Sequence, residues 1–195
     1  MATDTRDRMV TAATRLFAER GYDATGFRDI VDQAAAARGA IYHHFPEGKA
    51  ELGESVALHA GGHLADVVAQ LCATRRPEQA LAALFDLVTD TLVEGPHRPG
   101  CPVTAVTLAA DDPDGRLRAA GAGIFGRLRA AVHDCLVGDG VPPDVAVTTA
   151  ALVVCATEGA VILCRAEGSR RPIDLVRRAL LQQLALLPRG VVGPV

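Results

Sequence analysis

Apolar residues recur every three or four positions along most of the chain, which is the period of an amphipathic helix. The first such stripe consists of Met9, Ala12, Ala13, Leu16 and Phe17. It is followed by Gly21, and glycine often ends helices. Glycine and proline divide the rest of the chain in the same way. The pattern predicts about nine helices, over residues 5–20, 26–34, 38–45, 49–75, 77–94, 101–110, 114–138, 144–166 and 172–187.

The composition agrees with this helical pattern. Apolar residues make up 49% of the 195 residues and charged residues 22%, which excludes an intrinsically disordered chain. Alanine, leucine and arginine, which favour helices, are abundant, whereas aromatic residues, which favour strands, are only 4%. We therefore predict an all-α fold, with a helix-turn-helix domain over residues 1–48 and a larger helical domain over residues 49–195.

The first three predicted helices have the lengths and spacing of a helix-turn-helix unit. Thr25 is a suitable N-cap for the helix over residues 26–34. Arg28 then falls at the third helical position, where the helix dipole disfavours a cation. Since helix stability does not account for Arg28, we expect this side chain to have an anionic partner outside the helix.

The next helix, over residues 38–45, would lie in the major groove of DNA, because the last helix of such a unit has that place. Arg38 can pair with guanine or hold a phosphate, and Gly39 and Ala40 are small enough to let base edges approach. Donors for phosphate oxygens are supplied by Tyr42, His43, His44 and Lys49. The pattern indicates DNA binding, and the alternative is a small three-helix scaffold with incidental polar residues.

Net charge does not by itself indicate a nucleic-acid partner. The formal net charge is −3, and basic and acidic side chains are equal in number over the first 50 residues. A DNA-binding surface must therefore come from the placement of a few residues and not from a general positive field.

Four segments resemble the N-terminal domain of the TetR/AcrR transcriptional repressors. They are Phe17-Ala-Glu-Arg-Gly-Tyr-Asp-Ala-Thr25, Arg28-Asp-Ile30, Gly39-Ala-Ile-Tyr-His-His-Phe45 and Lys49-Ala-Glu-Leu52, in near-continuous register over about residues 8–55. The resemblance implies DNA contacts at Thr25, Arg28, Arg38, Gly39, Ala40, Tyr42, His43, His44 and Lys49.

The turn between the second and third helices departs from this family pattern. The family usually has Ala-Gly-Val-Ser here, and this chain has Ala34-Ala-Ala-Ala37. Ala35 replaces the turn glycine and tolerates a positive φ poorly, and Ala37 replaces a serine N-cap, a loss of about 1 kcal/mol. We expect a less rigid turn or a longer second helix, with weaker DNA binding.

The larger domain is similar to the LmrA/YxaF-like ligand-binding domain over about residues 98–187. The similarity lies in Gly100-Cys-Pro-Val-Thr, in Glu158-Gly-Ala-Val-Ile-Leu-Cys-Arg-Ala-Glu-Gly-Ser169 and in the Pro-Ile-Asp-Leu start of the last helix. It implies a helical ligand-binding domain and a homodimer formed by the last two helices of each subunit. The long, nearly uncharged helices over residues 144–166 and 172–187 fit such an interface independently.

One segment, residues 145–164, is apolar and long enough to cross a bilayer. It is interrupted by Thr148, Thr149, Thr157 and Glu158, and no aromatic belt flanks it. We therefore expect a buried or interface helix and no membrane partner.

A small apolar or amphipathic effector is expected to bind between the helices of the larger domain. The candidate lining residues are Phe85, Val88, Cys101, Thr104, Phe125, Leu128, His133 and Glu158. A lone acid such as Glu158 in an apolar helix either has a protein partner or binds a cationic ligand. The first possibility, a pair with an arginine or a hydroxyl in the dimer interface, is at least as consistent with the sequence.

The five cysteines are odd in number, widely spaced and without a Cys-x-x-Cys pair. Reduced thiols in a cytoplasmic protein are the expected state, and a redox-sensing thiol is the alternative. His59 and His63 lie four residues apart without a third ligand nearby, so we predict no metal site. The sequence has no phosphate-binding loop and no catalytic constellation, so we predict no cofactor and no enzymatic activity.

Together these patterns predict a cytoplasmic, ligand-responsive transcriptional repressor. It would bind a pseudo-palindromic DNA operator as a dimer and be released by a small molecule. The alternative is a sensing or redox-responsive regulator with weakened or lost operator binding, because of the alanine-rich turn.

Overall fold

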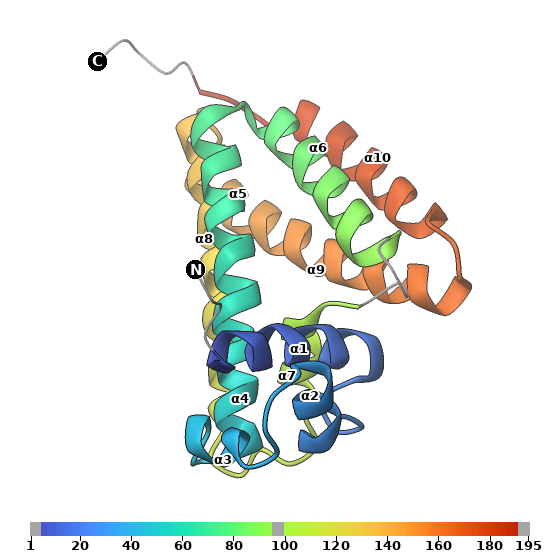
Figure 1. Cartoon of the computed structure of the whole chain (residues 1–195). Coiled ribbons are helices and arrows are strands. Elements are labelled where there is room, and N and C mark those ends of the chain that lie inside the picture. The colour runs from blue at the N-terminus through green and yellow to red at the C-terminus, as the bar shows by residue number, and fades with distance from the viewer. Residues whose placement is uncertain (1–4, 95–99, 191–195) are drawn as a thin grey trace. The chain divides into compact units, whose positions relative to one another are not determined.

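The computed structural model describes residues 5–94 and 100–190, and the fold over these residues is helical, without strands. The described residues form ten α-helices and two short π-helical segments (Figure 1). Because the π-helical segments continue α-helices without a break, the helical stretches number nine, and the all-α prediction is confirmed. The chain groups into two compact units, residues 5–63 with 100–124 and residues 64–94 with 125–190.

The first unit contains the predicted helix-turn-helix and the segments that pack on it. Its elements are α1 (Thr5–Arg20), α2 (Phe27–Gln33), α3 (Ala40–His44), α4 (Lys49–Val56), η1 (Ala57–Gly61), α7 (Pro102–Thr107) and the first part of α8 (Arg116–Gly138). The core of this unit is formed by completely buried side chains, among them Phe17, Ile30, Phe45 and Leu52. The unit extends beyond residue 48 because α7 packs against α1, α4 and η1. The boundary at residue 48, where we expect the helix-turn-helix to end, stays a prediction.

Glycines allow the close approach of α7 and α8 to the rest of the first unit. A Cβ on Gly61 would lie 2.6 Å from Ile124 Cγ2 and 2.8 Å from Val103 Cγ2. A Cβ on Gly121 would overlap the side chain of Thr107, whose hydroxyl donates to the Val103 carbonyl. These positions are occupied by glycine because the helix backbones meet there without room for a methyl group.

Replacing Gly121 by alanine is therefore expected to destabilise the protein by about 1–3 kcal/mol, the usual effect of overpacking. Rotation of Thr107 does not relieve the overlap, because its Cβ itself would lie 3.1 Å from the new methyl group. Gly123→Ala is the matched control on the same helix, where a Cβ meets nothing within 4 Å. The free energy of unfolding of the control should rise by about 1 kcal/mol, because alanine has a higher helix propensity than glycine. Urea denaturation of both variants measures the difference, and equal midpoints would contradict the packing.

The second unit consists of longer helices. Its elements are α5 (Gly62–Thr74) from Leu64 onward, α6 (Pro77–Val88), η2 (Thr89–Val93), the remainder of α8, α9 (Pro143–Glu167) and α10 (Arg171–Ala185). Prolines stand in the first turn of α6, α9 and α10, where the missing N–H is not needed. α9 ends at Gly168, which has a left-handed φ of 62°. In Figure 1, α6 lies beside α10, and Arg177 of α10 pairs with Asp86 of α6 at 2.6 Å.

Within the described residues, α9 is the one helix long and apolar enough to span a membrane by length and composition. Its most apolar window has a mean hydropathy of 2.0, and 39% of that window is buried. The buried face includes Ala150, Val153 and Cys164, and the opposite face exposes Val147 and Ile162. An exposed apolar face on a helix that is buried on its other side is typical of a subunit interface.

Candidate nucleic-acid interface

The start of α2 differs from the prediction at Thr25. The Thr25 side chain is completely buried, and its hydroxyl donates to the Gly21 carbonyl at 2.8 Å, at the end of α1. The N-cap is Gly26, whose N–H donates to the Asp29 carboxylate at 3.0 Å. The prediction of Thr25 as N-cap was wrong, because its side chain turns inward to the carbonyl end of the preceding helix. Arg28 consequently stands at the second helical position, not the third.

The turn after α2 contains a left-handed residue although it has no glycine. α2 ends at Gln33, and Ala35 has φ +48°, the one positive φ at a non-glycine residue in the described part of the chain. The Ala36 N–H donates to the Val31 carbonyl at 3.1 Å, and the Ala35 N–H donates to the Asp32 carbonyl at 3.3 Å. These two bonds form a Schellman motif, which places its left-handed residue at Ala35. The second helix is therefore not longer, and Ala35 adopts a strained conformation.

Ala35→Gly is expected to stabilise the protein by about 0.5–1 kcal/mol, since glycine adopts positive φ without the Cβ clash but leaves a more flexible unfolded chain. Ala37→Gly is the matched control in the same turn, because Ala37 is exposed and its φ is not positive. The control should be neutral or destabilising. Denaturant midpoints at equal m-values measure both changes, and stabilisation by both variants or by neither would contradict the assignment of strain to Ala35.

Helix α3 is shorter than predicted, because Arg38 and Gly39 form a turn before it. The Ala40 N–H donates to the Ala37 carbonyl at 2.9 Å, which closes this turn. Ile41 and Phe45 point into the core with exposures of 1% and 0%, as their spacing predicted. The outer side of α3 therefore faces solvent.

The exposed side of α2 and α3 forms an open groove of about 260 Å³. It is lined by Phe27, Arg28, Val31, Asp32, Arg38, Ile41 and Tyr42. The Phe27 and Tyr42 rings meet edge to face at 5.8 Å and hold the two helices in register. Arg28 lies 3.9 Å from Asp32, whereas Arg38 forms no hydrogen bond or ion pair within residues 5–94 and 100–190. The groove thus presents a guanidinium that has no partner in the described chain.

The other predicted DNA contacts differ in exposure. Gly39, Tyr42 and His43 are exposed, with Tyr42 at 66%, while Ala40 and His44 are half-buried. Thr25 is the one member of the predicted set that is fully buried. Eight of the nine residues are therefore exposed or half-buried, three of them (Arg28, Arg38 and Tyr42) line the groove, and the side chain of Thr25 lies inside.

Lys49 is held at the start of α4 by groups of its own unit. Its ammonium lies 4.4 Å from the centre of the Tyr22 ring and donates to the Asp23 carbonyl at 3.4 Å. Burial lowers the pKa of Lys49, and burial also raises the pKa of Tyr22 to about 12. A phosphate contact by Lys49 would compete with these interactions.

An arginine that the sequence analysis did not single out fixes the segment between α3 and α4. Arg116, at the start of α8, donates to the Glu54 carboxylate at 2.6 Å and pairs with Glu47. The Glu47 N–H in turn donates to the Glu51 carboxylate at 3.1 Å. These carboxylates are far from Arg116 in the sequence, so no local pattern could reveal the cluster. It ties α8 to the segment that follows the recognition helix.

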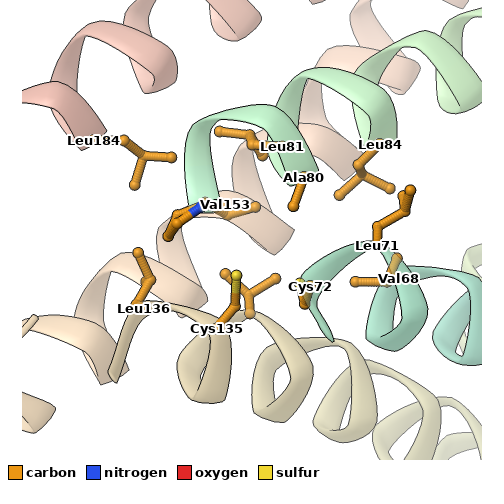
Figure 2. Close-up of a pocket in the computed structure, with 12 residues that line it drawn as sticks. Val68, Leu71, Cys72, Ala80, Leu81, Leu84, Cys135, Leu136, Val153 and Leu184 are labelled. Atoms are coloured by element: carbon orange, nitrogen blue, oxygen red, sulfur yellow. The ribbon is translucent and has the colours of Figure 1, made fainter. Parts of the chain in front are cut away.

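The second unit contains a small apolar cavity of about 20 Å³ between α5, α6, α8, α9 and α10 (Figure 2). Its lining includes Val68, Cys72, Leu81, Leu84, Cys135 and Val153. An adjoining cavity of about 30 Å³ shares Val68, Leu84, Val132 and Val153, and it adds Val88, Leu128 and Glu158. Glu158 is the one charged residue among the described residues that line either cavity.

Three of the eight predicted ligand contacts line these cavities, namely Val88, Leu128 and Glu158. Phe85 is completely buried in the core, and Phe125 and His133 lie outside both linings, with His133 2.9 Å from Asp134. Cys101 and Thr104 belong to the first unit, where Cys101 is the N-cap of α7. The apolar stripes identified core positions, but they could not distinguish a filled core from a cavity wall.

Two protein-family models match the two parts of the chain. Residues 10–56 match the family model of the bacterial regulatory proteins of the tetR family, and residues 77–179 match the C-terminal domain of LmrA/YxaF-like transcriptional regulators. The HTH-type transcriptional regulator Rv0196 of Mycobacterium tuberculosis is 35% identical over 180 residues, which cover 90% of this chain and 91% of that protein. This chain belongs to the TetR family.

Other TetR-family proteins agree with this assignment. The regulator LmrA of Bacillus subtilis is 37% identical over 67 residues, which cover 34% of each chain. A TetR regulator from Chloroflexus aurantiacus superposes with a TM-score of 0.78 at 26% identity, covering 95% of this chain and 96% of that one. One from Legionella pneumophila has a TM-score of 0.83 at 20% identity, covering 94% and 99%, which shows the shared fold.

Membership of the TetR family confirms the resemblance found in the sequence. The protein is a transcriptional regulator and not an enzyme, and regulators of this family bind DNA and act as dimers. The sequence analysis missed the Arg116 cluster and the two cavity cysteines, Cys72 and Cys135, because each joins residues that are distant along the chain.

Proposed function

We propose that this TetR-family regulator is a dimeric repressor that binds a pseudo-palindromic operator through α3 and leaves it when a small apolar or amphipathic molecule binds in the second unit. The observation that carries DNA binding is the open groove with Arg38 exposed and without a partner in the described residues. An arginine in this state is ready to form paired hydrogen bonds with guanine or a phosphate.

The neighbours of Arg38 support the same role. Tyr42 and His43 are exposed on the outer side of α3 and offer donors for phosphate oxygens. Gly39 leaves space for a base edge, because no atom lies within 4 Å of a Cβ placed on it. Base contacts would come from Arg38 and the small residues beside it, and backbone contacts from Arg28, Tyr42, His43 and His44.

The exposed apolar faces of α9 and α10 support a dimer. The two helices pack on each other, and their exposed faces carry Val147, Leu152, Ile162 and Leu163 on α9 and Leu175 on α10. A two-fold axis would bury the same face on both subunits as a four-helix bundle. Two copies of α3 would then contact successive turns of one DNA face.

The adjoining cavities support an effector that is largely apolar. Their lining is formed by aliphatic side chains and two cysteines, with one carboxylate from Glu158. A lipophilic molecule would match this lining once the surrounding helices move apart to admit it, and a cationic group on it would then lie near the Glu158 carboxylate. We propose this residue as the one that distinguishes cationic from uncharged effectors.

The helical stretch that joins the recognition helix to the effector unit contains a candidate hinge. α4, η1 and α5 follow one another without a break, and η1 is a π-helical turn that ends at Gly61. π-helical turns are often found at functional sites, and Gly61 and Gly62 lower the cost of bending. Effector binding to α5 would then move α4, and with it α3.

The test is binding of the purified protein to the intergenic DNA upstream of its own gene, measured by fluorescence anisotropy against unrelated DNA of equal length. Specific binding that weakens steeply with salt is expected, because phosphate contacts release counterions. Retention no tighter than on unrelated DNA would overturn the repressor and would favour a sensing protein that has lost operator affinity.

Glu158→Gln tests the effector site with two probes, the uncharged dye Nile red and the lipophilic cation tetraphenylphosphonium. We expect the variant to bind operator and Nile red as the parent does, and to bind the cation about tenfold more weakly, a loss of about 1.4 kcal/mol. Isothermal titration gives both affinities. Equal weakening for both probes would instead assign Glu158 a structural role.

A further inference from the structure

Two cysteines that are distant in the sequence meet in the second unit. Cys72 lies near the end of α5 and Cys135 near the end of α8, and Figure 2 shows them side by side in the cavity wall. The two cysteines line the same cavity and the same outer groove, and the two thiols are near enough for each to shift the pKa of the other. The two helices are also held together by Arg127 of α8 and Asp66 of α5, at 2.7 Å.

The pair separates the apolar cavity from solvent. Both cysteines line the cavity, and both also line an open groove on the outside that contains Arg75, Arg76 and Asp134. Each thiol is half-buried, so it can be reached from the groove without unfolding of the unit. The other cysteines differ, since Cys101 and Cys164 are buried and Cys155 is exposed on α9.

The interaction between the two thiols makes their pKa values unequal. It lowers the pKa of Cys72, because the Cys135 S–H stabilises the Cys72 thiolate, and the same interaction raises the pKa of Cys135. The thiolate is the form that attacks peroxides and disulfides, and a second thiol beside it resolves the product. Cys72 therefore has the character of an attacking thiol and Cys135 that of a resolving thiol.

We propose that Cys72 and Cys135 form a peroxide-reactive dithiol site whose oxidation to a disulfide links α5 to α8 and alters the cavity. The Cys72 thiolate attacks a hydroperoxide, so that an S–O bond forms, the O–O bond breaks and the alkoxide or hydroxide takes up a proton. The Cys135 sulfur then attacks the sulfenic acid at Cys72, so that the S–S bond forms and water leaves with the Cys135 proton. Two electrons pass from the two thiols to the peroxide, and a dithiol reductant reverses the change.

Formation of the bond must move the cavity wall. The two sulfurs are about 2.05 Å apart in a disulfide, and we expect this bond to draw the ends of α5 and α8 together. Val68 and Leu71 on α5 and Val132 and Leu136 on α8 line the same cavity, so they move with the two cysteines. We expect the oxidised protein to bind Nile red about tenfold more weakly, a typical size for coupling between two sites.

The decisive experiment is a peptide map of the native full-length protein after treatment with hydrogen peroxide or cumene hydroperoxide. Cleavage before aspartate separates Cys72, in residues 66–85, from Cys135, in residues 134–138, and places Cys155 and Cys164 in another peptide. The expected product is residues 66–85 linked to residues 134–138, released by dithiothreitol. Faster linking by cumene hydroperoxide would indicate entry through the apolar cavity, and faster linking by hydrogen peroxide entry through the open groove.

Cys72→Ser and Cys135→Ser should each abolish the link, and Cys155→Ser is the matched control that should retain it. A map in which Cys72 and Cys135 remain thiols while Cys155 is oxidised would overturn the proposal, as would a link formed only in denaturant. A native link without any change in Nile red affinity would overturn the coupling to the cavity. None of these measurements uses operator DNA, so they are independent of the proposed repressor function.

Discussion

Arg38→Ala is expected to weaken operator binding by at least about 30-fold while leaving the fold intact. A lost arginine contact to a base or phosphate costs about 1–3 kcal/mol, and a two-fold dimer loses it in both half-sites. Arg38 is exposed and has no partner in the described residues, so its removal should leave the free energy of unfolding nearly unchanged. Fluorescence anisotropy measures the affinity, and a denaturation curve checks the fold.

Arg15→Ala is the matched control for Arg38, because Arg15 is an exposed arginine on α1 that pairs, among the described residues, with Glu19 of its own helix at 3.5 Å. It removes the same charge from the same unit without touching the groove. The slope of log affinity against log salt concentration then distinguishes two kinds of contact. Loss of a phosphate contact lowers the steepness of this slope by about one per arginine, and loss of a base contact leaves the slope unchanged. Equal affinities for both variants would remove Arg38 from the interface.

Ile162→Asp is expected to dissociate the dimer and, with it, the operator complex. Ile162 is 54% exposed on the apolar face of α9, where the proposed four-helix bundle would cover it. The two-fold axis would bury two unpaired carboxylates, at a cost of several kcal/mol. We expect the dimer dissociation constant to rise by at least about 100-fold, which light scattering after gel filtration measures directly.

Val137→Asp is the matched control for the dimer, since Val137 is an exposed valine on α8, away from the proposed bundle. This variant should remain dimeric and bind operator as the parent does. If Ile162→Asp were also dimeric at low micromolar concentration, the exposed face of α9 would not be the interface.

The helix-turn-helix was predictable because its determinants are local. The inward positions of α1 and α3, such as Phe17, Ile41 and Phe45, follow from spacing alone, and each is buried in the structure. Helix ends were less predictable, because a cap depends on which way a side chain turns. Thr25 shows this, since its hydroxyl bonds to the end of α1 rather than to the start of α2.

In the alanine-rich turn, the sequence identified an unusual position but did not determine its conformation. The sequence indicated that Ala35 replaces a glycine, and it left open whether the turn would distort or the helix would lengthen. In the structure Ala35 takes φ +48°, because the burial of Ile30 and Ile41 on either side of the turn requires the chain to reverse there. Packing over the whole unit thus outweighs about 1 kcal/mol of local strain.

By itself, the sequence determined the helical class, the inward faces and the TetR-family helix-turn-helix, because periodicity and capping act over a few residues. Only the tertiary structure decided which apolar residues enclose a cavity, which arginine lines the groove of α2 and α3 without a partner in the described residues, and which cysteines meet. Cys72 and Cys135, like Arg116 and Glu54, are brought together by helices that are far apart along the chain. Such contacts follow from how helix faces pack, and no spacing within one helix encodes them.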